Sequence, residues 1–214
     1  MHTHNPSMLQ PIPDLEFFED IHRYRYLDEW LPYSVTGVLG YDMPEEVRRR
    51  IDETKDGPNG WQIRGNTVHN ALEAFLTERP VIYGDFEEWI TPLMSCWLFK
   101  ESEVLAVEYR MCDRIKRIGG STDFILKTKK GATVLGDLKT VSSSPAVDRR
   151  KPADEQLGAY TTMLSGFPGM PYIDKCVTVV AGPGKTRIMT SDPGECAAKW
   201  LEAWGKFEAA EVQF

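Results

Sequence analysis

The sequence predicts a mixed α/β (α+β) protein in which a central mixed β-sheet is flanked by helices. The order of local patterns carries this prediction: helical segments come first, then three β-rich runs, a helix, two more β-rich runs and a last helix. The chain has 214 residues, of which 42% are hydrophobic and 27% charged. This composition fits one globular domain with a sizeable core. We therefore predict a flexible N-terminal tail over residues 1–14 and a single domain over residues 15–214.

The N-terminal part mixes strand and helix signals. Residues 15–27 carry aromatic and aliphatic side chains in partial alternation, which indicates a strand or hairpin. Residues 34–40 begin like a short capped helix, and residues 42–55 read as a helix with Pro44 early and acids in its first turn. The sequence GPNG at residues 57–60 ends this pattern.

The clearest helix is predicted over residues 61–80, where Pro80 closes the pattern. Its apolar stripe at helical spacing consists of Val68, Ala71, Leu72, Phe75 and Leu76. His69 and Glu73 are four residues apart and share one margin of that stripe. A helical region broken or started by Pro92 follows over residues 85–101, and residues 104–112 read as a strand.

After the hairpin described below, residues 142–152 are predicted to be a loop and residues 153–166 a short helix that ends at Gly166. Residues 173–190 form a second hairpin about GPGK. A final helix has Asp192 as N-cap and Pro193 in its first turn. Trp200, Trp204 and Phe207 line one face of this helix and are expected to anchor the core.

Residues 119–140 are predicted to form a β-hairpin with the turn at the Gly-containing stretch around Lys130. Asp123 and Asp137 lie equally far from that turn, so they should face each other across the two strands. Because side chains alternate between faces, one face carries Asp123, Ile125, Leu135, Asp137 and Lys139. The other face, apolar enough to be core, carries Thr122, Phe124, Leu126, Val134 and Leu138.

Two directly opposed carboxylates, with Cβ atoms roughly 5 Å apart, repel each other unless a positive charge lies between them. A divalent cation would supply that charge, and Lys139 would lie beside it. Two alternatives stay open at this point. Asp and Lys side chains are common on solvated faces, and a register shift of one residue would move Asp137 to the other face.

Four short motifs follow one another along the chain: G-x-x-x-H at Gly65–His69, G-x-x-D at Gly120–Asp123, D-x-K at Asp137–Lys139 and Q-x-x-x-Y at Gln156–Tyr160. In this order they resemble the PD-(D/E)XK nuclease superfamily, especially its RecB-like exonuclease branch. The phrases SVTGVLG and GDLKT are similar to mitochondrial genome maintenance exonucleases and their phage and bacterial relatives. The resemblance covers about residues 17–181. It implies a restriction-endonuclease-like core and a deoxyribonuclease that depends on Mg²⁺ or Mn²⁺.

The resemblance also implies roles for individual residues. Asp123 and Asp137 match the acids that bind metal and take part in catalysis, and Lys139 matches the catalytic lysine. His69 and the backbone carbonyl of Leu138 complete the implied metal ligands. The residues implied on the substrate side are Gln156, Tyr160 and Glu108, the last where some members place another acid.

Two departures from the family pattern stand out. Thr122 replaces the proline before the first acid, which the RecB-like branch tolerates. The cysteines of the cluster-bearing members are absent, so no iron-sulfur cluster is expected. The four cysteines, expected to be reduced core thiols, are Cys96, Cys112, Cys176 and Cys196.

The expected function is metal-dependent hydrolysis of DNA, by an exonuclease acting on single strands or DNA ends in replication, repair or recombination. A non-catalytic nucleic-acid-binding protein on the same fold and a structure-specific endonuclease are the alternatives. DNA is the expected partner, and a homo-oligomer would suit a processive enzyme. The net charge of −7 argues against binding polyanions through bulk charge. Tyr24 and Tyr26, flanked by Arg23 and Arg25, are candidates to stack on bases.

The expected location is the cytoplasm of a bacterium or phage-infected cell. No apolar run approaches the roughly 18 residues that could span a membrane. The first residues also lack the apolar stretch of a signal peptide.

Overall fold

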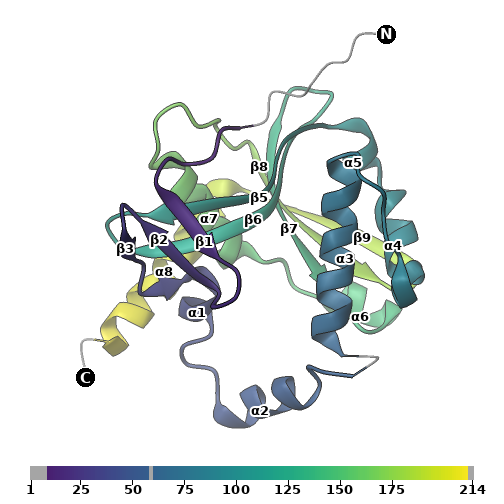
Figure 1. Ribbon diagram of the computed structural model, residues 1–214, viewed down its shortest axis with the longest axis horizontal. Helices are drawn as coiled ribbons and strands as arrows, with labels where there is room; N and C mark the ends of the chain where they lie inside the picture. Colours follow the sequence, from purple (N-terminus) through teal and green to yellow (C-terminus); the bar gives the residue numbers. More distant parts are fainter. Residues whose placement is uncertain (1–8, 58–59, 212–214) are drawn as a thin grey trace.

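The computed structural model describes residues 9–57 and 60–211, which form a mixed α/β fold with a central mixed sheet between helices (Figure 1). The strands build a three-stranded sheet in the order β1-β2-β3 and a six-stranded sheet in the order β4-β6-β7-β8-β9, with β5 paired to β6. Their bounds are β1 Leu15–Phe18, β2 Arg23–Tyr26, β3 Glu29–Trp30, β4 Tyr33–Ser34, β5 Glu103–Asp113, β6 Ile118–Lys127, β7 Thr133–Thr140, β8 Lys175–Gly182 and β9 Lys185–Ser191.

Eight α-helices and one short 3-10 helix are found within the described residues. Their bounds are α1 Val35–Leu39, α2 Glu45–Glu53, α3 Trp61–Leu76, η1 Gly84–Phe86, α4 Glu87–Met94, α5 Trp97–Glu101, α6 Ser144–Arg149, α7 Asp154–Ser165 and α8 Pro193–Glu211. None of the helices described is both long enough and apolar enough to cross a lipid bilayer.

Two separate cores lie against the large sheet because its strands bury both faces. On one face, α3, α4 and α5 pack on the side chains of Phe124, Leu126 and Leu138. On the other face, α1, α7 and α8 pack on Ile125 and Leu135. Neighbouring residues of β6 and β7 therefore point to opposite helical layers.

The β6–β7 register agrees with the prediction. Phe124 pairs with Gly136 and Ile125 with Leu135, which is the alignment that centres the turn on Lys130. The predicted hairpin over residues 15–27 and the hairpin of β8 and β9 also form. At the start of α1, the Ser34 hydroxyl accepts a hydrogen bond from the backbone N–H of Gly37 at 3.1 Å, which confirms the predicted cap.

Three local predictions were wrong. The predicted loop over residues 142–152 contains α6, in which Val147 is buried. Pro92 neither breaks nor starts a helix but lies inside α4, where the Glu88 carbonyl accepts the backbone N–H of Gly184 at 2.9 Å. That bond from a neighbouring segment replaces the one that a proline at position 92 cannot donate.

The third error concerns the predicted tail. Residues 1–8 lie outside the described part, but residues 9–14 are packed on the domain. The backbone N–H of Leu9 donates to the Leu105 carbonyl at 2.7 Å, and the hydroxyl of Tyr109 donates to the Gln10 carbonyl at 2.8 Å. Ile12 is 3% exposed. This short segment therefore belongs to the core beside β5.

Candidate metal site and its surroundings

The site is built where β7 separates from β6. One edge of β6 pairs with β4 at residues 118–119 and with β7 from Phe124 onward, so residues 120–123 lie in the fork between these two pairings. Side chains satisfy backbone groups there. The Thr122 hydroxyl donates to the Gly136 carbonyl at 2.7 Å, and the Asp123 carboxylate accepts the backbone N–H of Leu138. The fork thus fixes Asp123 at the point where side chains of both helical layers can meet.

Three potential metal ligands converge at this fork. His69 from α3, Glu108 from β5 and Asp123 from β6 offer ligand atoms that all lie within 4.8 Å of one another. His69 Nδ1 is 3.1 Å from Asp123 Oδ1. Among the described residues, these form the one group of at least three His, Cys, Asp or Glu side chains with such spacing. Two carboxylates and an imidazole fit a divalent cation, and the nitrogen ligand suits manganese better than magnesium.

Glu108 reaches this group through an unusual backbone conformation. It lies between the Val107–Phe124 and Tyr109–Thr122 pairs, and its φ is 48°. A residue other than glycine costs roughly 1–2 kcal/mol in this left-handed region. Such strain persists where the surrounding structure enforces it, often at functional sites. Here the strained residue is the one that brings a second carboxylate to Asp123.

Asp137 and Lys139 form a second group on the α7 side of the fork. Lys139 Nζ lies 2.9 Å from Asp137 Oδ2 and donates to Gln156 Oε1 at 2.8 Å. Gln156 Nε2 donates both to Asp137 Oδ1 and to the Tyr160 hydroxyl oxygen, each at 2.8 Å. One glutamine side chain therefore holds the acid, the lysine and the tyrosine in fixed relative positions.

The carboxylates at the fork perturb one another and His69. Burial disfavours the imidazolium, but the negative charges of Asp123, Asp137 and Glu108 outweigh it and raise the pKa of His69 to about 9. Burial, reinforced by the Asp123 charge, raises the pKa of Glu108 to about 7. At neutral pH a protonated His69 thus supplies part of the positive charge that these acids need.

The two aspartates differ in their protonation behaviour. Burial acts to raise both pKa values. For Asp123, the charge and hydrogen bond of His69 and the Leu138 N–H prevail, so its pKa is lowered. For Asp137, burial outweighs the favourable Lys139 charge, so its pKa is raised. Environments that shift the pKa values of two neighbouring carboxyl groups in opposite directions are typical of sites with acid and base roles.

Close packing explains the glycine in the G-x-x-D motif. A Cβ atom on Gly120 would lie 2.7 Å from the Tyr160 ring and 2.9 Å from the Val35 side chain. Tyr160 is 2% exposed, and burial raises its pKa well above the usual value. Gly120 thus leaves the space that Tyr160 needs in order to reach Gln156.

The structure brings together the residues that the sequence assigned to the metal, to catalysis and to the substrate side, but it divides them into two groups, and Asp137, expected as a metal ligand, is not in the group of potential ligands. Glu108, expected on the substrate side, lies with His69 and Asp123, whereas Asp137 lies with Lys139 and Gln156. Leu138 was expected to offer its carbonyl to a metal; in the structure its N–H donates to Asp123. The position of Glu108 opposite Asp123 on adjacent antiparallel strands is the signal that could have placed it in the group.

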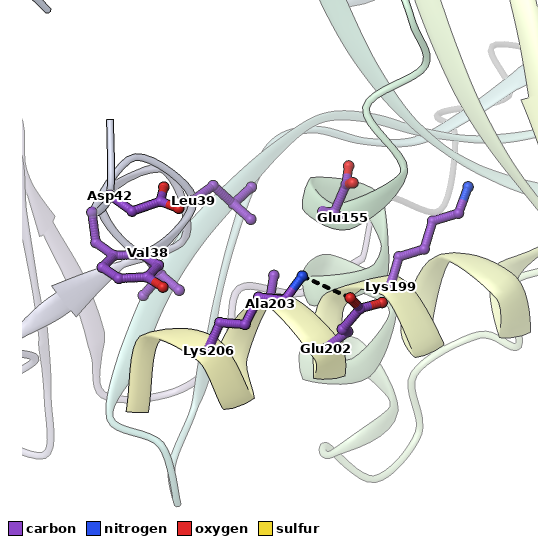
Figure 2. Close-up of a pocket in the computed structure, with 9 residues that line it drawn as sticks. Val38, Leu39, Asp42, Glu155, Lys199, Glu202, Ala203 and Lys206 are labelled. Carbon is purple, nitrogen blue, oxygen red and sulfur yellow. Dashed lines mark hydrogen bonds and ion pairs between the residues drawn. The ribbon is translucent and has the colours of Figure 1, made fainter. Parts of the chain in front are cut away.

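A separate hollow of about 170 Å³ lies between α1, α7 and α8 (Figure 2). Its two lysines are already paired: Lys199 binds Asp154, and Lys206 donates to Glu202 at 2.7 Å. Glu155 lines this hollow, while the next residue, Gln156, belongs to the fork. The hollow and the candidate metal site are therefore distinct places on α7.

The chain has remote similarity to known proteins. No family model matches the chain, and no curated protein matches it. Among solved structures, 20 chains match, including the one titled "Crystal structure of SSO0001". That likeness covers 79% of this chain and 73% of the other, at 16% sequence identity and a TM-score of 0.42. A likeness this remote carries no conclusion about function.

Proposed function

We propose that the protein is a deoxyribonuclease that depends on Mg²⁺ or Mn²⁺ and acts as an exonuclease on single strands or DNA ends, in replication, repair or recombination. The observation that carries the proposal is the convergence at one fork of His69, Glu108 and Asp123 beside Asp137 and Lys139. Non-catalytic binding of nucleic acid would need neither this group of potential ligands nor a lysine held beside a buried acid.

Phosphodiester hydrolysis requires that charge on the phosphate be neutralised and that water be made nucleophilic near neutral pH, and a bound divalent cation supplies both effects. His69, Glu108 and Asp123 would hold it. Asp137 supports the proposal because it is only 4% exposed and lies on the same strand, two residues before Lys139.

Lys139 has the position expected of an electrostatic group in this reaction. Its amine is held by Asp137 and Gln156, so the charge is oriented, and the side chain is 24% exposed, so it remains partly open to solvent. A preoriented ammonium in a water-poor site stabilises developing negative charge more strongly than one in bulk water. Gln156 and Tyr160 act as positioning residues for it.

The test is cleavage of end-labelled DNA with Mg²⁺ or Mn²⁺, with EDTA as the blank. We expect Asp123→Asn and Lys139→Met each to lower the rate by at least about a hundredfold, the scale of a lost electrostatic contact in an active site. Asp148→Asn is the matched control, because that aspartate is 59% exposed and pairs with Lys185. DNA left intact under both metals would refute the proposal.

A circular single strand separates the exonuclease from an endonuclease. An enzyme that requires ends leaves the circle intact and degrades the same strand once it is linearised. Cleavage of both forms at equal rates would assign the fork to an endonuclease. Retained DNA binding without any cleavage would favour a binding protein.

A further inference from the structure

The outward face of the small sheet gathers aromatic and cationic side chains. Pairing places Phe18 opposite Arg23 and Arg25 opposite Trp30, so these four side chains share one face. Tyr24 and Tyr26 occupy the opposite face. Tyr24 is 5% exposed, and its ring fills the space beside Gly119. Alternation along β2 turns both tyrosines toward the domain, and buried Tyr24 therefore cannot stack on a base as expected.

The outward side chains are in contact with one another. The ring centroids of Phe18 and Trp30 are 5.0 Å apart. The guanidinium of Arg23 lies 4.8 Å from the Trp30 ring centroid, and that of Arg25 lies 5.1 Å from the Phe18 ring centroid. These contacts hold two aromatic rings and two planar guanidinium groups side by side at the surface. They form a ready-made platform for another planar group.

The platform also offers positive charge. Arg25 is paired with Glu16. Arg23 is exposed and forms no ion pair with any residue that the structure describes, so its charge is available to an anion. Trp30 is 38% exposed, an unusual position for the largest apolar side chain. An exposed indole beside an uncompensated guanidinium matches a nucleotide, which presents a flat base next to a phosphate.

We propose that the face formed by Phe18, Arg23, Arg25 and Trp30 binds a segment of single-stranded nucleic acid, with a base on Trp30 and a phosphate at Arg23. Paired bases hide their faces, so a duplex cannot use the platform in this way. The sheet lies across β5 and β6, the strands that carry Glu108 and Asp123 (Figure 1). A strand held on this face would lead to the fork. That role as a substrate path rests on the proposed nuclease function.

Binding is measured by fluorescence anisotropy of a labelled oligothymidylate of about 12 nucleotides in EDTA, where no cleavage can interfere. We expect Trp30→Ala to weaken binding by about 5- to 140-fold, the range for loss of one stacked base. Arg23→Gln should lower the salt dependence of log K by about 0.7, the change for one phosphate contact on a single strand. Trp30→Phe keeps a stacking ring and should retain most of the affinity.

Trp97→Ala is the matched control, because Trp97 is 57% exposed on α5, away from the small sheet. Equal affinities of Trp30→Ala, Trp97→Ala and the unchanged protein would overturn the proposal. So would equal affinity for a duplex of the same length, or no binding of the oligonucleotide at all. Should Trp30→Ala fail to fold, Arg23→Gln decides alone, since its side chain is exposed.

A small substrate separates this proposal from the nuclease proposal. Thymidine 5′-p-nitrophenyl phosphate is too short to span from the fork to the outward face of the sheet. We expect Trp30→Ala to hydrolyse it at the unchanged rate with Mn²⁺ while degrading long strands more slowly. If neither this substrate nor long strands are hydrolysed by the unchanged protein, the nuclease function is removed, and the anisotropy result still decides whether the sheet binds single strands.

Discussion

Glu108 combines two unfavourable features that a purely structural residue would avoid. Its φ of 48° is rare for a residue with a side chain, and its carboxyl group is half-buried and close enough to Asp123 to have a pKa raised to about 7. Both features oppose folding of the metal-free protein. A bound cation would offset the second by neutralising the acids. This is the pattern expected when stability is traded for function.

Exchanging Glu108 separates the two features. Glu108→Gly removes both the backbone strain and the half-buried acid, whereas Glu108→Gln removes the acid but keeps the strain. In EDTA, we expect the free energy of unfolding of the glycine variant, measured with urea, to be about 1 kcal/mol higher than that of the glutamine variant. Both should lose the stabilisation that Mn²⁺ gives the unchanged protein. A glycine variant less stable than the glutamine variant would contradict the strain argument.

His69 makes the stability of the metal-free protein depend on pH. Its pKa rises from 6.5 in the unfolded chain to about 9 in the folded protein, so its contribution is fully present below pH 6.5 and is lost as the pH rises through about 9. The loss should be at most about 3 kcal/mol, because each unit of pKa corresponds to 1.36 kcal/mol. Urea unfolding in EDTA across this range measures it.

His69→Gln should flatten that dependence. The control is His22→Asn in the β1–β2 turn, where φ is 51° and asparagine tolerates the left-handed region. An unchanged slope for His69→Gln, or an equal change for His22→Asn, would show that other groups cause the pH dependence.

At the scale of secondary-structure elements, the close contact between β6 and α7 sets the geometry of the fork. Gly120→Ala places a methyl group 2.7 Å from the Tyr160 ring and 2.9 Å from the Val35 side chain, both of them buried. We expect the free energy of unfolding to fall by about 1–3 kcal/mol through overpacking. Cleavage should also be slower, because Tyr160 and Gln156 must move. The melting temperature should fall by about 2–4 °C for each kcal/mol.

The chain offers a matched glycine for this experiment. Gly205 lies in α8, and a Cβ atom there would meet nothing within 4 Å. Gly205→Ala should raise stability by about 0.5–1 kcal/mol through helix propensity, without any effect on cleavage. Equal effects of the two substitutions on the melting temperature would contradict the packing argument at Gly120.

Local chemistry made several elements predictable, and tertiary packing decided the rest. The cap at Ser34, the Asp192 side chain that accepts the N–H groups of Gly194 and Glu195, and the turn around Gly131 are encoded within a few residues. By contrast, α6 has a Ser- and Pro-rich sequence typical of a loop. Its Val147 packs against Gly182 of β8, so a distant strand stabilises a helix that local preference does not favour.

At the scale of the whole molecule, the fork gathers residues from both helical layers around three acids in a chain of net charge −7. A cation that binds the folded but not the unfolded chain stabilises it by mass action. At about a hundredfold excess over Kd, Mn²⁺ should raise the melting temperature by about 5–10 °C. Mg²⁺ should act more weakly, because it prefers oxygen to the imidazole nitrogen.

The affinity for Mn²⁺ should rise with pH, because the ion competes with protons on Glu108, whose pKa is about 7, and on His69, whose pKa is about 9. Titration calorimetry in buffers of different ionisation heat measures the protons released. Asp123→Asn should abolish both the binding and the release, and Asp148→Asn should leave them unchanged. Equal Mn²⁺ binding by Asp123→Asn would place the ion elsewhere.

The sequence by itself determined the features that depend on near neighbours: the β6–β7 register, the helix caps and the shared position of Asp137 and Lys139 on one strand. Only the tertiary structure decided which distant side chains complete the site. His69 reaches Asp123 because α3 packs where the strands separate, and Glu108 joins them through a backbone conformation that its residue type disfavours. Local preferences act over a few residues, whereas these contacts depend on how whole layers pack on the sheet.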